Sequence, residues 1–548
     1  MASTHDQLEA GGWAGAAWWV IVFTALTVLF IKYVICIILE AIWWKPMRIV
    51  RKMQSQGIKA RPYQLLGGDF PEMMKLVKAA QSETMTTISH DIVPRILPCL
   101  GPWCASLGTS HVFWQGTAAP TLTVMDPEMV KDIMSTKSSC FHRASLEKKV
   151  LLEFIGKNIL TIEDDEWTHH RRIINSTFNI EKLKGMLGAM VTSTDKMIKR
   201  WATVDQLQED SCFEVEVCEE FYKLAMDIFS RTSFGNAHKQ SKKFGRFQVE
   251  LKKLVMSPSH LVWTIVIPGY RILPTPNNRH INRIKRNMNR ILDEIIRVRL
   301  QRAESGKLRD YGNDLLGCLL YESEAGDHET KGRKKLSIND VIHECHALLF
   351  AGHDSTANLL TWTIMLLSLH PQWQERARKE VLEICNGKPI DDEKLRGFKI
   401  LTMILQEVLR LYPAVADLTR VAVKNTTIQG WSIPEGLQVW VPILQIHRDP
   451  EQWGADALEF RPDRFAGGVS KACKNSHSYI PFSCGQRTCV GQTFAMMEAK
   501  VALSMILQRF SFQLSSKYKH GPTTKGALHP EFGMPVIFHK LTSFENKD

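Results

Sequence analysis

The chain has 548 residues, of which 44% are hydrophobic and 23% are charged. This composition excludes an intrinsically disordered or collagen-like chain, and it allows a large buried core. The basic surplus of +12 comes from residues scattered along the sequence, so it favours an anionic membrane surface or an acidic protein partner over nucleic acid.

The first predicted element is a membrane-spanning helix. The stretch from Gly11 to Ile31 carries no charged residue and is long enough to cross a bilayer. Asp6 and Glu9 precede it, where a cleaved signal peptide would carry basic residues, so we expect the segment to be retained. The sequence therefore predicts three parts: an anchor at 1–45, a linker at 46–62 and one large domain at 63–548.

Basic residues concentrate just after this apolar stretch, at Lys32, Lys45, Arg48, Arg51 and Lys52. The positive-inside rule then places the bulk of the chain on the cytoplasmic side of the membrane. The cysteines agree with this placement, because the twelve of them form no C-x-x-C pair and are too sparse for a disulfide framework.

Beyond the anchor, the hydrophobic periodicity predicts a mainly α fold with small β-sheets. Amphipathic helices are expected at 180–203, 213–233, 278–304, 338–370 and 373–385. Short strands are expected at 121–125, 420–430 and 437–441. The polar stretch 322–335 is predicted to be a loop.

The helix expected at 338–370 begins with a capping-box pattern formed by Ser337 and Asp340, and Pro371 ends it. Its middle carries Asp354, Ser355 and Thr356 among leucine and phenylalanine residues. An acid beside two hydroxyls competes with helical hydrogen bonds, and an exposed polar patch is excluded by the apolar neighbours. We therefore interpret this turn as functional.

Several other enzyme classes lose support. The nearby run from His343 to His346 places its histidines three apart, whereas zinc proteases need them four apart in H-E-x-x-H. The chain also has no G-x-S-x-G elbow, no G-x-x-x-x-G-K loop and no dinucleotide-binding glycine pattern. Serine hydrolase, P-loop and nicotinamide-binding interpretations are thereby disfavoured.

A second constellation comprises Glu407 and Arg410, with Arg464 much later in the sequence. Glu and Arg three residues apart are usually a helix-surface pair. Leucine and valine residues surround this pair, however, which predicts that it is buried. A buried carboxylate can accept hydrogen bonds from a second guanidinium, and Arg464 is the candidate.

The third constellation is the run from Phe482 to Gly491, which contains Arg487 and Cys489. A lone cysteine is normally a core residue, but Cys489 follows a glycine-punctuated loop and precedes an amphipathic helix. A helix N-terminus favours the thiolate form, which is the form that binds a metal.

The motifs F-x-x-G-x-R-x-C-x-G, E-x-x-R, A-G-x-D-S-T and P-D-R-F all occur in this sequence, which resembles the cytochrome P450 family over roughly residues 60–540. The resemblance implies the cytochrome P450 fold for 63–548, as a haem-thiolate catalytic domain, and haem b as cofactor. Cys489 would be the axial iron ligand, and Glu407, Arg410 and Arg464 would form the structural triad. The residues that would approach the haem propionates are Trp167, Arg171, Arg420 and Arg487.

Two positions depart from the family pattern. Ser483 stands where the family often has glycine, and Ser355 stands where a threonine usually takes part in oxygen activation. Serine keeps the hydroxyl, so Ser355 and Thr356 both remain candidates for relaying protons.

The resemblance implies a monooxygenase that inserts one oxygen atom of dioxygen into a C–H bond, with Asp354 and Ser355 or Thr356 delivering protons. Electrons would come from a separate NADPH–cytochrome P450 reductase, and the protein would be a single-pass protein of the endoplasmic reticulum membrane with its catalytic domain in the cytoplasm. A haem-thiolate isomerase or dehydratase and a haem sensor or carrier are the rival interpretations, and the intact Asp354–Ser355 pair argues against both.

Local sequences such as Trp44-Lys45-Pro46 and Gln56-Gly57-Ile58 narrow the resemblance to the plant clan numbered seventy-two. That clan implies a small apolar substrate: a terpenoid, a steroid-like or other hormone, or a fatty acid. No residue in the sequence selects among these classes, because the pocket is assembled from distant loops.

Overall fold

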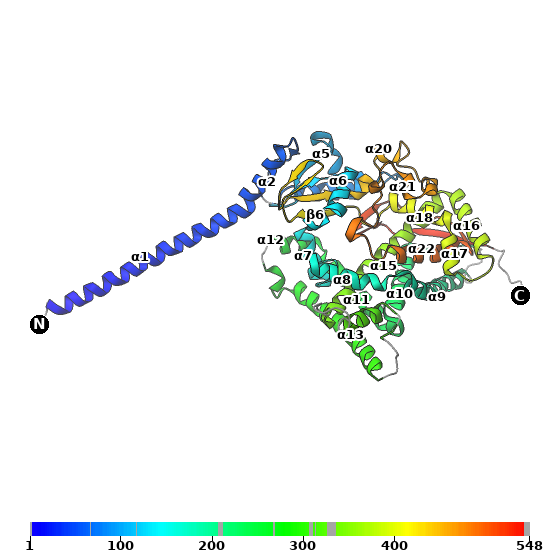
Figure 1. The fold of residues 1–548 in the computed structure, drawn as a ribbon, viewed down its shortest axis with the longest axis horizontal. Coiled ribbons are helices and arrows are strands. Elements are labelled where there is room, and N and C mark those ends of the chain that lie inside the picture. The colour runs from blue at the N-terminus through cyan, green and yellow to red at the C-terminus, as the bar shows by residue number, and fades with distance from the viewer. Residues whose placement is uncertain are drawn as a thin grey trace.

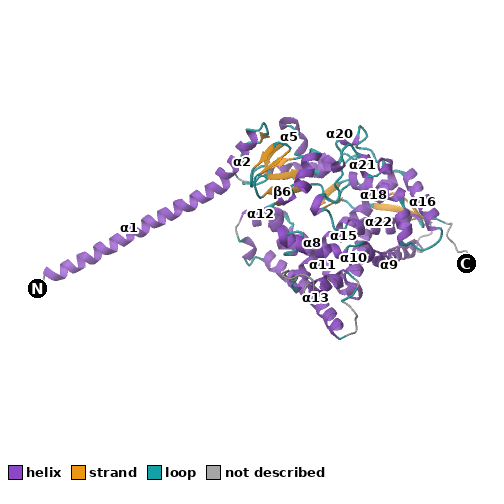
Figure 2. Cartoon of the chain, viewed as in Figure 1, coloured by secondary structure: helices purple, strands orange, loops and turns teal. Residues whose placement is uncertain are grey.

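The computed structural model describes residues 3–65, 67–116, 118–205, 212–266, 269–305, 311–312, 314–325 and 336–541. Helices dominate the fold, and short strands lie both beside α2 and on the far side of the body near α22, as Figure 2 shows. The helices are α1 Ser3–Leu39, α2 Lys45–Gln54, α3 Phe70–Ser82, α4 Val93–Ile96, α5 Leu100–Leu107, α6 Pro127–Lys131, α7 Ser145–Ile155, α8 Asp164–Thr177, α9 Ile180–Asp205, α10 Val217–Phe234, α11 His238–Val255, α12 Pro258–Val266, α13 Pro276–Glu304, α14 Leu315–Ala325, α15 Ile338–Leu369, α16 Pro371–Cys385, α17 Asp392–Gly397, α18 Lys399–Leu411, α19 Ile443–Ile446, α20 Pro450–Trp453, α21 Val469–Ala472 and α22 Gln492–Leu507.

The strands form small sheets instead of one layer. A six-stranded sheet has the order β1-β2-β3-β9-β6-β4, a three-stranded sheet has the order β10-β13-β5, and two hairpins pair β11 with β12 and β7 with β8. The strands are β1 Lys59–Ala60, β2 His111–Trp114, β3 Pro120–Thr123, β4 Phe141–Arg143, β5 Cys212–Glu216, β6 Leu418–Ala422, β7 Thr426–Ile428, β8 Trp431–Ile433, β9 Gln438–Val441, β10 Phe510–Leu514, β11 Pro522–Lys525, β12 Ala527–Pro530 and β13 Pro535–Lys540. The mainly α fold with small β-sheets is confirmed.

Helix α1 projects from the body of the protein as an isolated rod (Figure 1). Among the described residues, one helical stretch, Ile21–Gln54, contains a window long and apolar enough to cross a membrane, and none of that window is buried. Large apolar side chains left in contact with water would be costly, so a membrane is the environment that suits this helix.

The segment 46–62, expected to be a linker, contains ordered elements. Ile49, Val50 and Met53 of α2 are buried in the same core cluster as the six-stranded sheet, and β1 pairs with β2 in parallel. The polar residues and Pro46 had suggested a loose connection, but Pro46 lies in the first turn of α2, where proline is tolerated. Helix α1 is therefore attached to the body through a packed helix.

The long helices lie where the periodicity predicts them, within a few residues at each end. Three predictions need correction. The strand expected at 420–430 is divided between β6 and β7, which belong to different sheets. The helix expected from residue 213 starts at Val217, because Cys212–Glu216 forms β5 and pairs with β13. The loop expected at 322–335 begins later, because α14 continues to Ala325, and residues 326–335 lie outside the described part of the chain.

The centre of the body is α15, which packs against α10, α18 and α22. Ser337 and Asp340 form the predicted capping box, with each side chain bonded to the other's backbone N–H. The helix continues without a break to Leu369 and presents buried side chains along most of its length. This rigid element carries the Asp354–Ser355–Thr356 turn.

Glu498 of α22 is a carboxyl group completely buried in the main core, and neither side-chain oxygen has a hydrogen-bond partner among the described residues. Burial raises its pKa well above the usual value, so the folded protein binds a proton that the unfolded chain releases at neutral pH. Stability should then fall as the pH rises above about 4.5, with a limiting slope of about 1.4 kcal/mol per pH unit.

We expect Glu498→Gln, which cannot ionise, to be more stable than the parent at pH 8, with the advantage shrinking towards pH 5. Thermal unfolding midpoints across this range measure the difference. Glu383→Gln, on the exposed surface of α16, controls for removal of a charge. Parallel curves for Glu498→Gln and the parent would contradict a neutral Glu498.

Candidate haem-thiolate site

The cysteine-bearing loop has a tightly constrained backbone. The N–H of Cys489 donates to the carbonyl of Phe482 at 2.9 Å, and the short helix η8 Gly485–Arg487 lies between them. A Cβ on Gly485 would lie 2.1 Å from the carbonyl oxygen of Met134, so only glycine permits this contact with the neighbouring segment. The loop therefore holds Cys489 in one place just before α22 begins.

The thiol of Cys489 is exposed, although protein surrounds it closely enough that burial raises its pKa. The backbone N–H groups of Gly491 and Gln492 and the positive charge of Arg171 lower the pKa in opposition. A side chain that is both accessible and desolvated faces internal space, and the same groups that favour its thiolate would support a bound metal.

Four of the other predicted residues lie around this cysteine. Burial lowers the pKa of Arg171 and the nearby Cys489 thiolate raises it in opposition. The guanidinium of Arg171 lies 5.9 Å from the ring centroid of Trp167. Arg487 lies over the same ring at 4.3 Å and donates to the carbonyl of Ile162 at 3.3 Å. Arg420 is close enough for the charge of Arg487 to lower its pKa. The structure thus brings these residues together from α8, β6 and the cysteine loop.

Arg420 has no carboxylate bonded to it among the described residues. Its guanidinium is buried, and its one hydrogen bond among the described residues runs from Nη1 to the carbonyl of Thr419 at 3.0 Å. Burial, followed by the charges of Arg143 and Arg487, lowers its pKa to about 10. The Nε of Arg143 is also buried without a partner. Because Glu163 pairs with Arg487 and Glu147 with Arg143, Arg420 is left for an additional anion.

The functional turn of α15 also borders open space. Ala351 is exposed in the middle of this largely buried helix, and Ser355 lies one turn further along the same face. The hydroxyl of Ser355 donates to the carbonyl of Ala351 at 2.7 Å, whereas Thr356 is buried and donates to that of Gly352 at 3.0 Å. Ser355, but not Thr356, therefore borders the open side of the helix.

Asp354 pairs with a residue that sequence reasoning missed. Its Oδ2 accepts from Nζ of Lys252, on α11, at 2.7 Å, and Nδ2 of Asn358 donates to its backbone carbonyl. The two charged side chains are 22% and 23% exposed, so the pair lies between the interior and solvent. The 102 residues that separate them leave no signal in the sequence.

Two further contacts hold this turn in place. His353 contacts the hydroxyl of Tyr222 through Nε2 at 2.7 Å, and burial lowers its pKa, so the imidazole is neutral at pH 7. Gly352 allows α10 to pass close by, because a Cβ there would lie 2.5 Å from the ring of Phe229. Both contacts fix α10 against the turn.

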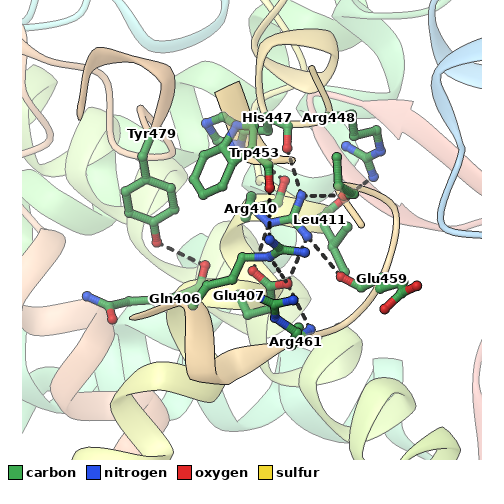
Figure 3. A network of polar contacts seen from close by, with 12 residues as sticks. Gln406, Glu407, Arg410, Leu411, His447, Arg448, Trp453, Glu459, Arg461 and Tyr479 are labelled. Carbon is green, nitrogen blue, oxygen red and sulfur yellow. Dashed lines mark hydrogen bonds and ion pairs between the residues drawn. The ribbon is translucent and has the colours of Figure 1, made fainter. Parts of the chain in front are cut away.

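The second predicted constellation, Glu407, Arg410 and Arg464, lies apart from these residues and forms a buried network (Figure 3). Glu407 accepts from Nε and Nη2 of Arg410 at 2.7 and 2.8 Å, and from the backbone N–H of Arg461 at 2.9 Å. Nε of Arg464 lies 3.4 Å from the same carboxylate. The network joins α18 to the segment before the cysteine loop. Its side chains are buried from solvent, so its role is structural.

Ser483 adopts a left-handed backbone conformation with φ of 63°, and its buried hydroxyl has no hydrogen-bond partner among the described residues. Glycine suits such a position, so we expect Ser483→Gly to stabilise the protein by about 1 kcal/mol. Ser476→Gly, an exposed serine in a short helix nearby, should instead destabilise it slightly. Unfolding midpoints compare the two, and an equal loss in both variants would contradict the strain argument.

The fold and these residues define a class of protein, the haem-thiolate enzymes. Residues 107–536 match the family model for cytochrome P450. A cytochrome P450 of Paris polyphylla, CYP72A616, is 40% identical over 92% of this chain and 95% of its own length. Secologanin synthase 1 of Catharanthus roseus is 39% identical over 92% of this chain and 95% of its own length. The 7-deoxyloganic acid hydroxylase of the same plant is 37% identical over 95% of this chain and 98% of its own length.

The chain therefore belongs to the cytochrome P450 family, and its relatives are those of the plant clan numbered seventy-two. It is a monooxygenase by family, and haem b is the cofactor of that family. The predicted family, clan and cofactor are confirmed. The residues present fit the group, since an accessible cysteine, open space beside α15 and an unneutralised buried arginine are what a thiolate-ligated, dianionic porphyrin requires.

Proposed function

We propose that this protein is a hydroxylase of the endoplasmic reticulum membrane that inserts one oxygen atom into a C–H bond of an apolar substrate. The proposed substrate is a terpenoid, a steroid-like or other hormone, or a fatty acid, and the proposed electron donor is NADPH–cytochrome P450 reductase. The observation that carries the proposal is an accessible, desolvated Cys489 in a protein whose central helix leaves Ala351 exposed and Ser355 partly exposed on one face. The names of two relatives, a 7-deoxyloganic acid hydroxylase and a secologanin synthase, support plant small-molecule oxidation.

Each site residue has a role that its surroundings support. Cys489 would hold the haem iron, while Trp167, Arg171, Arg420 and Arg487 would contact the propionates. When bound, haem supplies dioxygen activation, and a thiolate ligand favours cleavage of the O–O bond. Helix α1 would anchor the chain by a single pass, with residues 63–548 as the catalytic domain in the cytoplasm.

Proton delivery would use Asp354 and Ser355. The ion pair with Lys252 holds the Asp354 carboxylate at the boundary with solvent, where it can exchange protons with water. The hydroxyl of Ser355 borders the open side of α15, so it can reorient from the Ala351 carbonyl towards a reacting group. Thr356 would instead stabilise the helix, because it is buried against its own turn.

Asp354→Asn is expected to slow turnover by about 10²-fold or more while haem content stays close to that of the parent, because general acid–base catalysis typically contributes that much. Ser355→Ala should slow turnover as well, and Thr356→Val serves as its matched control on the adjacent residue. Steady-state rates and haem content measure the effects. An unaffected Asp354→Asn, or an equal loss in Thr356→Val, would contradict the assignment.

The reaction class is tested by incubating the full-length protein with a plant reductase, NADPH and a panel of terpenoids, hormones and fatty acids under ¹⁸O₂. One labelled oxygen atom in the product is expected. A product formed without label and without NADPH would instead identify an isomerase or dehydratase. Binding of haem without turnover of any kind would favour a sensor or carrier.

A further inference from the structure

A pocket of about 580 Å³ lies between α9, α10 and α11, away from the cysteine loop. These helices lie side by side below α15 in Figure 1, with α10 in contact with both neighbours. The volume is in the range of small-molecule sites in proteins. None of the residues assigned above to the cysteine, the propionates or proton delivery lines this pocket.

Basic side chains dominate the charged lining of the pocket. It is lined by Lys196 and Arg200 of α9, Lys223 and Arg231 of α10, and Arg246 of α11. Asp227 is the one acidic residue in the described lining, and it accepts from Nε of Arg231 at 2.8 Å.

Carboxylates neutralise part of this charge. Glu220 accepts from Arg200 at 2.8 Å and from Lys223 at 3.0 Å, and Lys223 also reaches Glu219. Within the described part of the chain, Lys196 and Arg246 have no acidic partner, and both are exposed. Two cations on opposite helices therefore remain available at the mouth of the pocket.

Apart from Ser193 and Tyr222, the uncharged lining of the pocket is apolar. Met226 and Val249 present accessible surface to the pocket, while Met197 and Leu224 are fully buried within its wall. Gly245 brings α10 and α11 together there, since a Cβ would lie 2.5 Å from Sδ of Met226. A hollow with an apolar floor and two unneutralised cations at its mouth is complementary to an apolar molecule that carries one negative charge.

We propose that this pocket is a second ligand-binding site, for an amphipathic organic anion such as a carboxylate with one apolar chain. The apolar chain lies against Met226 and Val249, and the carboxylate lies at the mouth beside Lys196 and Arg246. The residues of this site are distinct from those proposed for substrate oxidation, and binding to it does not depend on the function proposed above.

The site also contacts the functional turn. Tyr222 lines the pocket and bonds His353, the residue before Asp354. A ligand in this pocket that moves the Tyr222 hydroxyl therefore changes the rate at which the protein oxidises a different molecule, the substrate at the haem site. This effect rests on the proposed function, whereas binding does not.

The test uses the full-length haem-loaded protein in nanodiscs of zwitterionic lipid, with the catalytic site saturated by an azole that occupies the iron. Equilibrium dialysis with radiolabelled laurate, corrected for empty nanodiscs, should give one saturable site per chain. The double variant Lys196→Glu/Arg246→Glu should weaken laurate binding at least tenfold, because two charge-assisted contacts become repulsive.

The matched control is Lys199→Glu/Lys243→Glu, which makes the same charge change on exposed positions of the same two helices outside the pocket. Its laurate affinity should stay within about twofold of the parent, since exposed charges outside contact distance are largely screened. Absence of a saturable site in the azole-saturated parent would overturn the proposal. Equal weakening by both double variants would overturn it too, because the attraction would then be general.

Discussion

Replacing Cys489 with alanine is expected to abolish turnover and to remove the red-shifted Soret band of the reduced, carbon monoxide-bound protein. No other thiol can take its place, because the loop from Phe482 fixes the backbone of Cys489 by a 2.9 Å hydrogen bond and the contact of Gly485 with Met134 permits no shift. The absorption spectrum measures the ligand directly, and product formation with a reductase measures the consequence.

Cys484→Ala is the matched control, because Cys484 lies five residues earlier in the same loop. Burial raises the pKa of its thiol to about 11, so it remains a neutral, half-buried packing residue at pH 7. This variant should keep the thiolate band and most of the activity. If the parent itself lacked the band, or if Cys484→Ala alone removed it, the ligand assignment would be wrong.

Local patterns predicted the elements whose signal is contained within a few residues. The capping box at Ser337 and Asp340, the proline after α15 and the apolar stretch of α1 each depend on neighbours in sequence, and each is present in the structure. Cys489 and Arg487 could be proposed as haem-binding residues because they share one motif. Residues 213–216 were misassigned because a strand as short as β5 depends on its partner β13, more than 300 residues away.

The rest of the site depends on contacts between distant segments, which no local pattern encodes. Lys252 reaches Asp354 from α11, and Arg143 reaches the neighbourhood of Arg420 because β4 and β6 pair in register at these two residues. The choice between Ser355 and Thr356 likewise depends on which face of α15 meets open space. Adjacent residues on a helix point about 100° apart, so burial distinguishes them only once the neighbours of the helix are known.

Glu407→Gln is expected to destabilise the protein by about 3–5 kcal/mol, which is the usual cost of leaving one partner of a buried ion pair without the other. Arg410 and Glu407 both have side chains that are 0% exposed. Arg410 uses its whole guanidinium, because it also donates to the carbonyls of His447, Ala457 and Glu459 at 2.8, 2.6 and 3.0 Å (Figure 3). Lysine has no planar fork, so Arg410→Lys should lose almost as much stability as Glu407→Gln.

Denaturant unfolding and haem retention measure the effect, with Asp463→Asn as the control on an ion pair next to Arg464 in sequence. Asp463 pairs with Arg376 at 3.2 Å, but these side chains are 51% and 46% exposed, so the control should change stability by no more than about 1 kcal/mol. The double variant Glu407→Leu/Arg410→Met should cost less than the sum of the two single losses, because neither member of the Glu407–Arg410 pair is then left buried without the other. Additive losses, or a control as damaging as Glu407→Gln, would show that the network does not act as a coupled buried pair.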